Sequence, residues 1–435
     1  MKRKKIDVRR SLRVSLGDGL FASVMLGVTD NYVIPFALLL GATVQQVGLI
    51  GGLPNLLGSL SQLGAARLVQ RLGSRLRLLT RTVTIQAATL VMIAFLARVD
   101  MPYRVEGLLL LLALFTVAGA LGRPAWGSLM TEYLPRQTRG SYFGRRNLLL
   151  GIVNAASMIG AGFLLYTSKE FSHMIGFFVI FMIAAVCRFV SGVYVAQMSD
   201  VPQKRDPASD FTFFMFLGRF RESNFVKFVA FVAALTFAAH LASPFFAVYM
   251  LRDLQFSYLT YTAVQVVSTG AGLVALPWWG RHADLVGNAR VLRLSGFVVT
   301  LIPLLWLVSR NVVYLTLVQA LAGFGWSGVT LCAGNFIYDA VTPQKRVRCI
   351  GYFNVITGSA LFFGASAGGF LAGSLPPLQG SPILTLFVIS SLCRLAMYFA
   401  LFRSFQEVRP SKEVSFSELF FSVTGVRPII GPSGE

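Results

Sequence analysis

Two similar stretches of sequence indicate how the chain is organised: EYLPRQTRGSYFGRRNLLLG at residues 132–151 and DAVTPQKRVRCIGYFNVITG at residues 339–358. An acid, an arginine, a glycine, an asparagine and a second glycine of the first stretch recur 207 positions later in the second. The pair Cys187-Arg188 also recurs, as Cys393-Arg394, 206 positions later. Seven matches at a nearly constant offset are not expected by chance, so we infer that the chain consists of two related halves.

The composition around these repeats is that of a membrane protein. The chain has 435 residues, of which 55% are hydrophobic and 13% are charged, whereas soluble domains carry about 25% charged residues. The mean hydropathy is +0.67. This composition argues against a soluble enzyme. With about 20 apolar residues for each span and short connections between spans, the length accommodates on the order of twelve membrane helices.

Apolar windows mark where these helices are expected. They lie at about 16–41, 45–69, 78–97, 106–132, 143–166, 172–196, 225–251, 257–280, 291–309, 311–340, 348–373 and 381–404. Because each half contains an even number of spans, the two copies have the same orientation and are related by a pseudo-two-fold axis along the membrane normal. The predicted fold is an all-α polytopic membrane protein with two six-helix bundles.

This prediction also divides the chain into domains. We expect an N-terminal bundle at 1–196, a polar and Pro-containing cytoplasmic linker at 197–224, a C-terminal bundle at 225–404 and a cytoplasmic tail at 405–435. The tail contains EVSFSELFFSV at residues 413–423, which fits either an interfacial helix or a disordered segment.

The charge distribution predicts the orientation in the membrane. The chain has 39 Lys and Arg against 18 Asp and Glu, a net charge of +21. The basic residues concentrate in alternate short loops, which is the positive-inside pattern and places both termini in the cytoplasm. This pattern also argues against nucleic acid as the partner of the basic residues. The four cysteines lie singly and without the spacing of disulfides or metal sites, so we expect no cofactor.

Asp30 is the acidic residue that lies well inside an expected span. An ionised carboxylate in hydrocarbon is costly, so such a residue faces water, pairs with a base, accepts a proton or is held by structural hydrogen bonds. We predict proton coupling at Asp30, with Arg123 on the fourth span as its electrostatic partner. His240 occupies the repeat position of Asn31 and is a second candidate, although a satisfied core histidine is the alternative.

Polar and aromatic residues at helical spacing mark a candidate substrate cavity, for which interhelical hydrogen bonding is the alternative role. The candidates are Asn31, Tyr32, Trp126, Asn147, Asn154, Trp326, Asn335 and Asn354.

Loop motifs give the chain a family resemblance. GRHADLVGNAR at residues 280–290 resembles the G-x-x-x-D-x-x-G motif of the major facilitator superfamily, and residues 66–75 are a second version with Ala66 and Gln70 in place of Gly and Asp. Glu132 to Gly140 is similar to a loop pattern of the family's sugar porters. Arg123-x-x-x-Gly127 resembles a motif of its proton-coupled members.

The resemblance implies that acids at the cytoplasmic helix ends pair with loop arginines and close the inner side of the cavity. The expected gate residues are Arg71, Gly73, Arg75, Glu132, Arg139, Gly280, Asp284, Gly287, Arg290, Asp339 and Arg346.

Together these features predict a secondary active transporter that moves a small molecule by alternating access, in lipid and as a monomer. The expected location is the bacterial inner membrane. An uncoupled facilitator and a transporter-like sensor that binds without translocating remain open. An intramembrane enzyme is disfavoured because no catalytic cluster is found at membrane depth. The sequence leaves the substrate and the direction of transport undetermined.

Overall fold

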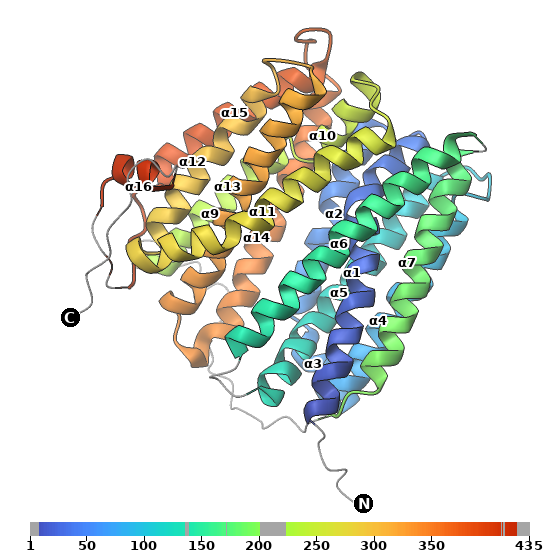
Figure 1. The fold of residues 1–435 in the computed structure, drawn as a ribbon, viewed down its shortest axis with the longest axis vertical. Coiled ribbons are helices and arrows are strands. Elements are labelled where there is room, and N and C mark those ends of the chain that lie inside the picture. Colours follow the sequence, from blue (N-terminus) through green and yellow to red (C-terminus); the bar gives the residue numbers. More distant parts are fainter. Residues whose placement is uncertain are drawn as a thin grey trace, which may run out of the picture. The chain divides into compact units, whose positions relative to one another are not determined.

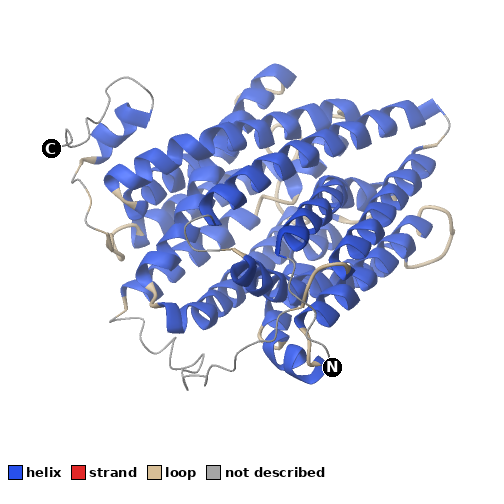
Figure 2. Ribbon diagram, turned by 60° about the horizontal axis from the view of Figure 1, so that its bottom comes forward, coloured by secondary structure: helices blue, strands red, loops and turns tan. Residues whose placement is uncertain are grey.

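The computed structural model describes residues 8–134, 139–170, 172–200, 223–409, 411 and 414–423. Helices make up nearly all of this part of the chain, and it contains no β-strand (Figure 2). Most of the expected linker, residues 201–222, lies outside the described residues. The all-α prediction is confirmed.

The chain divides into two compact units. Unit 1 comprises Met1–Pro207 and Pro244–Ala263, and unit 2 comprises Ala208–Ser243 and Val264–Glu435. The helices of the first half are α1 (Val8–Leu39), α2 (Val44–Gln62), α3 (Ala65–Leu72), α4 (Arg75–Phe95), α5 (Arg104–Tyr133), α6 (Arg139–Thr167) and α7 (His173–Ala196) (Figure 1). The second half contains α9 (Asn224–His240), α10 (Phe245–Val248), the π-helical turn η2 (Tyr249–Asp253), α11 (Tyr258–Val286), α12 (Asn288–Leu305), α13 (Val312–Ala340), α14 (Pro343–Ala372), α15 (Pro382–Leu401) and α16 (Phe416–Val423).

The internal repeat of the sequence is also a repeat of helix packing. In unit 1, α1 packs against α6 and α7, and α4 packs against α5 and α7. In unit 2, α9 packs against α14 and α15, and α12 packs against α13 and α15. Each of these four pairs in unit 1 therefore has its counterpart in unit 2.

Eleven helices of the described chain are long and apolar enough to cross a membrane. The remaining expected span corresponds to α2, a helix of 19 residues that contains three glutamines, an asparagine and four glycines and is therefore less apolar. Large apolar side chains remain exposed on the spans, such as Leu110 at 71% and Val274 at 81%. In water these surfaces would be unfavourable, whereas lipid solvates them.

Proline affects the first span of each half differently. Pro35 lies inside the continuous helix α1. Pro244, its counterpart in the repeat, is the last residue of a turn at 241–244 that separates α9 from α10. The segment from Pro244 to Ala263 packs with unit 1, although α9 packs in unit 2. The interruption is therefore the point at which the chain passes from one unit to the other.

Candidate functional site

Unit 1 contains an open cavity of about 270 Å³. This volume is close to the lower end of the about 300–1,000 Å³ that is typical of small-molecule sites. Its polar lining comes from α1, α4, α5, α6 and α7, and consists of Asp18, Ser23, Thr82, Gln86, Arg123, Trp126, Arg146 and Arg188. The remaining lining is mainly Gly, Ala, Val, Leu and Met, so a few polar groups face an otherwise apolar space.

Arg188 is the centre of a buried polar network on one side of this cavity. Its Nε and Nη2 donate to Gln86 Oε1 at 3.0 and 2.6 Å, and its Nη1 donates to Ser191 Oγ at 2.8 Å. Ser191 Oγ in turn donates to Asp18 Oδ1 at 2.7 Å, and Arg188 Nη1 lies 4.0 Å from the same oxygen. The buried carboxylate of Asp18 is thus neutralised within the bundle, as a charge at membrane depth requires.

Gln86 takes part in this network because a glycine of the neighbouring helix leaves room for it. Its Nε2 donates to the Phe115 carbonyl at 3.1 Å. A Cβ on Gly119 would lie 2.6 Å from that Nε2, so any side chain at position 119 would displace the amide. The close approach of α4 and α5 therefore positions both polar ends of Gln86.

Arg146 and Trp126 form the other polar side of the cavity. The Arg146 guanidinium lies 4.6 Å from the centre of the Trp126 ring, within the range of a cation–π interaction. Its Nη2 donates to the Ser15 carbonyl at 3.3 Å. Arg146 Nε and Trp126 Nε1 are buried and have no hydrogen-bond partner among the described residues. Two donors in the cavity wall are therefore available to a bound molecule.

Asp30 lies on α1 beyond this cavity, and its side chain is exposed on unit 1. No side-chain hydrogen bond or ion pair joins Asp30 to another residue of the described chain. The exposed Arg123 guanidinium acts on it electrostatically without forming a direct ion pair. The structure therefore presents a carboxylate inside a membrane span that is not neutralised by direct contact.

The other cavity candidates of unit 1 have different surroundings. Tyr32 is fully buried, and its hydroxyl bonds the Met158 carbonyl at 2.7 Å and Thr262 Oγ1 at 2.6 Å, so it links α1 to α6 and α11. Asn31 donates to the Gly27 carbonyl at 3.1 Å, within α1. Asn154 reaches the Ser23 carbonyl at 3.5 Å, whereas Asn147 is exposed on α6.

The candidates of unit 2 lie on α9, α13 and α14. His240 Nδ1 is 2.9 Å from the Thr236 carbonyl, one turn earlier on α9. Trp326 packs against the hydrophobic core of unit 2. Asn335 and Asn354 are half-buried. Of the predicted cavity residues of unit 1, Trp126 lines the cavity described above, whereas Asn31, Tyr32, Asn147 and Asn154 do not. The four candidates of unit 2 have no such cavity in common among the described residues.

The loop-motif residues of unit 1 form a tight ion pair. Arg75, only 2% exposed, donates from Nη1 to Glu132 Oε1 at 2.7 Å and from Nη2 to Oε2 at 2.8 Å. Gly73 ends α3 with φ 66°, a left-handed conformation that suits glycine, and so allows the chain to turn into α4 at Arg75. The pair therefore joins the start of α4 to the end of α5.

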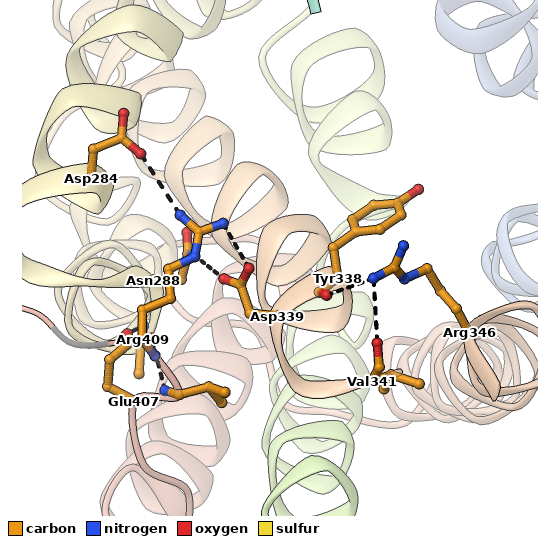
Figure 3. A network of polar contacts seen from close by, with 10 residues as sticks. Asp284, Asn288, Tyr338, Asp339, Val341, Arg346, Glu407 and Arg409 are labelled. Atoms are coloured by element: carbon orange, nitrogen blue, oxygen red, sulfur yellow. Dashed lines mark hydrogen bonds and ion pairs between the residues drawn. The ribbon is translucent and has the colours of Figure 1, made fainter. Parts of the chain in front are cut away.

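The corresponding acid of unit 2 has a different partner from the one expected. Asp339 accepts a bond from Asn288 Nδ2 at 2.8 Å and one from Arg409 Nη2 at 2.6 Å (Figure 3). Arg346, an expected partner, points to the Tyr338 carbonyl at 3.0 Å. The guanidinium that neutralises Asp339 therefore comes from the C-terminal segment and not from a loop.

The remaining gate candidates contribute less. Arg71 is exposed, Gly280 is inside α11 with open space where a Cβ would lie, and Arg290 bonds Ser411 Oγ at 3.0 Å. Arg139 begins α6, but its side chain lies outside the described residues. Asp284, with a side chain that is 80% exposed, lies 3.9 Å from Arg409.

Sequence reasoning did not identify Asp18, Gln86, Arg146 and Arg188 as cavity residues, or Arg409 as a partner of Asp339. The sequence would have marked Asp18 as a residue inside a helix only if the first helix had been predicted to begin near residue 8, as α1 does. Asp18 lies almost three turns from that end of α1. Among the described residues, no group of three or more His, Cys, Asp or Glu could hold a metal ion.

Two stretches of the chain, residues 19–241 and 226–430, each match the family model described as Major Facilitator Superfamily. The solved structure of the nucleoside transporter NupG is similar over 91% of this chain and 98% of its own, with a TM-score of 0.68 and 15% identity. A bacterial homologue of the human lysosomal transporter Spinster, inward-facing and unoccupied, has a TM-score of 0.62 and 14% identity over 93% of this chain and 98% of its own. At these identities the likeness concerns the fold.

Two curated relatives match shorter stretches. Vacuolar basic amino acid transporter 1 of Saccharomyces cerevisiae is 29% identical over 93 residues, which are 21% of this chain and 16% of the relative. An uncharacterized protein in the sodM 3' region of Geobacillus stearothermophilus is 32% identical over 120 residues, 27% of this chain and 56% of the relative. The matches thus span less than two thirds of either relative. The family matches cover both halves, and the chain therefore belongs to the Major Facilitator Superfamily.

Proposed function

We propose that the protein is a secondary active transporter, which carries a small molecule by alternating access and couples it to protons through Asp30. The family and the fold support transport. The observation that supports coupling is the exposed carboxylate of Asp30 inside span α1, which has no direct ionic partner in the described chain.

The cost of an unpaired charge is the physical reason for this role. A carboxylate at membrane depth must remain in contact with water or take up a proton, because hydrocarbon does not solvate it. The charge of Asp18 is compensated by a hydrogen bond from Ser191 and by the nearby Arg188 guanidinium. Asp30 has no such contacts, so protonation is the remaining way to remove its charge when water is excluded.

The cavity of unit 1 suggests the kind of substrate. Three guanidinium groups, Arg123, Arg146 and Arg188, line it, together with one carboxylate, Asp18. Arg188 is committed to Gln86 and Ser191, whereas Arg123 and the Nε of Arg146 have no hydrogen-bond partner in the described chain. We propose that the substrate presents a carboxylate, a phosphate or another strong acceptor to these two arginines, and an apolar or aromatic part to Trp126.

The relatives bear on this proposal only by their names. One carries nucleosides and another is named for basic amino acids. A basic amino acid would offer its carboxylate to the arginines of the cavity. We do not include Tyr32 in the wall, because its buried hydroxyl already has two partners.

We further propose that the ion pairs at the helix ends act as gates. Arg75 and Glu132 join two helices of unit 1, and Arg409 and Asp339 join the C-terminal segment to α13 in unit 2. Such pairs would keep each helix end rigid in one transport state and release it in another. Both termini are proposed to be cytoplasmic, in a bacterial inner membrane, with the protein acting as a monomer. We regard an enzymatic activity as disfavoured.

Thermal stabilisation of the purified protein by a library of metabolites and drugs tests this proposal at acidic and alkaline pH. A bound ligand raises apparent stability by mass action. We expect a hit with an acceptor group whose affinity depends on pH in the wild type and in the control Asp100→Asn, but not in Asp30→Asn. A pH-independent hit would favour an uncoupled facilitator, and binding without flux in proteoliposomes would favour a sensor.

A further inference from the structure

The segment that follows the last span is part of the packed structure of unit 2. Phe405 is fully buried, and its ring lies 5.1 Å from that of Phe231 and 5.7 Å from that of Phe336. The next residue, Gln406, is held by two hydrogen bonds with Asn224, at 2.9 and 2.7 Å. The chain is thus fixed at the base of α9 immediately before the charged residues that follow.

Glu407 contacts the loop motif of the second half. Its Oε2 accepts the backbone N–H of Ala289 at 2.7 Å, in the first turn of α12, where a negative charge is favourable. Gly287 has φ 92°, and a Cβ there would lie 2.3 Å from Glu407 Oε2. The motif glycine therefore leaves the space into which the C-terminal segment inserts its carboxylate.

Arg409 follows two residues later and joins two acids from different helices. Its Nη2 donates to Asp339 Oδ1 at 2.6 Å, and its Nη1 lies 3.9 Å from Asp284 Oδ1 (Figure 3). The Asp339 side chain is 10% exposed and that of Arg409 is 46% exposed. The bond is therefore sheltered on the acid side and accessible on the arginine side.

The first half shows what this arginine replaces. Glu132 is the repeat counterpart of Asp339, and its partner Arg75 lies two residues after the motif glycine Gly73. Two residues after Gly287, the second half has Ala289, and its neighbour Asn288 offers only a neutral amide to Asp339. The second half thus lacks an arginine at this position, and Arg290, one residue further on, bonds Ser411 Oγ at 3.0 Å.

We propose that Arg409 takes the place of that missing arginine, so that the C-terminal segment Phe405–Arg409 forms part of the second gate. The second gate is the Arg409–Asp339 pair of unit 2, and the first gate is the Arg75–Glu132 pair of unit 1. The inference rests on the gating role proposed above. It makes the conformational equilibrium of the transporter dependent on a segment outside the twelve expected spans. Arg409 acts as a positioning residue, because it holds the ends of α11 and α13 through Asp284 and Asp339 and need not touch substrate.

The test measures which side of the membrane the transporter faces, without any substrate. A single reporter cysteine replaces Asn335 on α13 in a background without the four native cysteines. Its labelling by an impermeant maleimide is compared in right-side-out and inside-out vesicles. The variants are Arg409→Ala, Glu132→Ala in the first gate, and the matched control Arg403→Ala. Arg403 is exposed two residues before that segment, and its guanidinium lies 5.1 Å from the centre of the Phe402 ring.

We expect Arg409→Ala and Glu132→Ala each to change the ratio of inside to outside labelling about fivefold in the same direction, toward the inside-open state. Arg403→Ala should leave the ratio unchanged. If Glu132→Ala shifts the ratio and Arg409→Ala does not, the inference about the tail is overturned and the first gate stands. If neither variant shifts it, the gating proposal fails together with the inference.

Two further measurements separate gating from folding. If the Arg409→Ala variant has a lower thermal stability but an unchanged labelling ratio, the proposal is overturned, because the segment then has only a structural role. The double variant Arg409→Ala/Ala289→Arg returns a guanidinium to the motif position used in the first half. Recovery of the wild-type ratio in this protein would support the replacement directly. A folded double variant that retains the ratio of Arg409→Ala would contradict it.

Discussion

Removing the carboxylate of Glu132 should destabilise unit 1 more than removing that of Asp339 destabilises unit 2. Glu132→Ala removes the carboxylate that neutralises Arg75, which is 2% exposed, while the hydrogen bond from Arg75 to Ser128 can remain. Breaking a buried pair by deleting one partner costs about 3–5 kcal/mol. Because the Glu132 side chain is 34% exposed, solvent weakens the ion pair and lowers this cost. We therefore expect Glu132→Ala to lose about 2 kcal/mol of unfolding free energy. Asp339→Ala leaves the half-exposed Arg409 free to reach water, and we expect about 1 kcal/mol.

The assay is reversible unfolding of the purified variants in mixed detergent micelles with increasing dodecyl sulfate, followed by tryptophan fluorescence. Glu132→Gln is the matched control, since it keeps an acceptor for Arg75 and should lose about half as much as the alanine variant. The free energy of unfolding could instead fall by less than about 0.5 kcal/mol in Glu132→Ala, or by no more than it falls in Asp339→Ala. Either result would show that the burial of Arg75 does not determine the cost of losing its partner.

Three further variants test the packing around the site. Arg188→Leu leaves the Asp18 carboxylate buried without its cation, so we expect about 3–5 kcal/mol of destabilisation and a large partial recovery when Asp18→Asn is added, both read from unfolding curves. Tyr32→Phe removes a hydroxyl that forms hydrogen bonds with two groups. The variant should lose about 1–2 kcal/mol of unfolding free energy, which is measured as a lower melting temperature. Gly323→Ala would place a Cβ 1.9 Å from the Ser268 carbonyl oxygen, so the yield of folded protein in size-exclusion chromatography should drop; a wild-type profile would show that α11 and α13 can separate.

The fold was predictable because its main signals are long and redundant. Each membrane span is a long apolar run, and the two copies of the pattern at residues 132–151 and 339–358 report the same architecture twice. The finer details depend on single residues in their surroundings. Pro35 and Pro244 hold the same position in the repeat, and their different effects could not be told apart from the sequence. Helix α1 continues through Pro35, whereas α9 ends at His240, four residues before Pro244.

The candidate site was predictable where a motif brought its residues together. Arg75 and Glu132 were both identified from loop patterns, and they bond each other. Arg188 stood out in the sequence only as part of the repeated Cys187-Arg188 pair, and the structure shows that Gln86 and Asp18 satisfy its charge inside unit 1. Arg409 has no motif around it, and only the fold brings it to Asp339. Contacts between residues far apart in the sequence remain invisible to periodicity and spacing.

Flux in proteoliposomes measures whether Asp30 couples transport to protons. A ligand identified by thermal stabilisation would be measured in two modes, uptake driven by an imposed pH gradient and exchange at equal pH on both sides. We predict that Asp30→Asn loses gradient-driven accumulation while it retains exchange, because exchange requires substrate translocation without net proton movement. Full gradient-driven accumulation in Asp30→Asn would contradict the account.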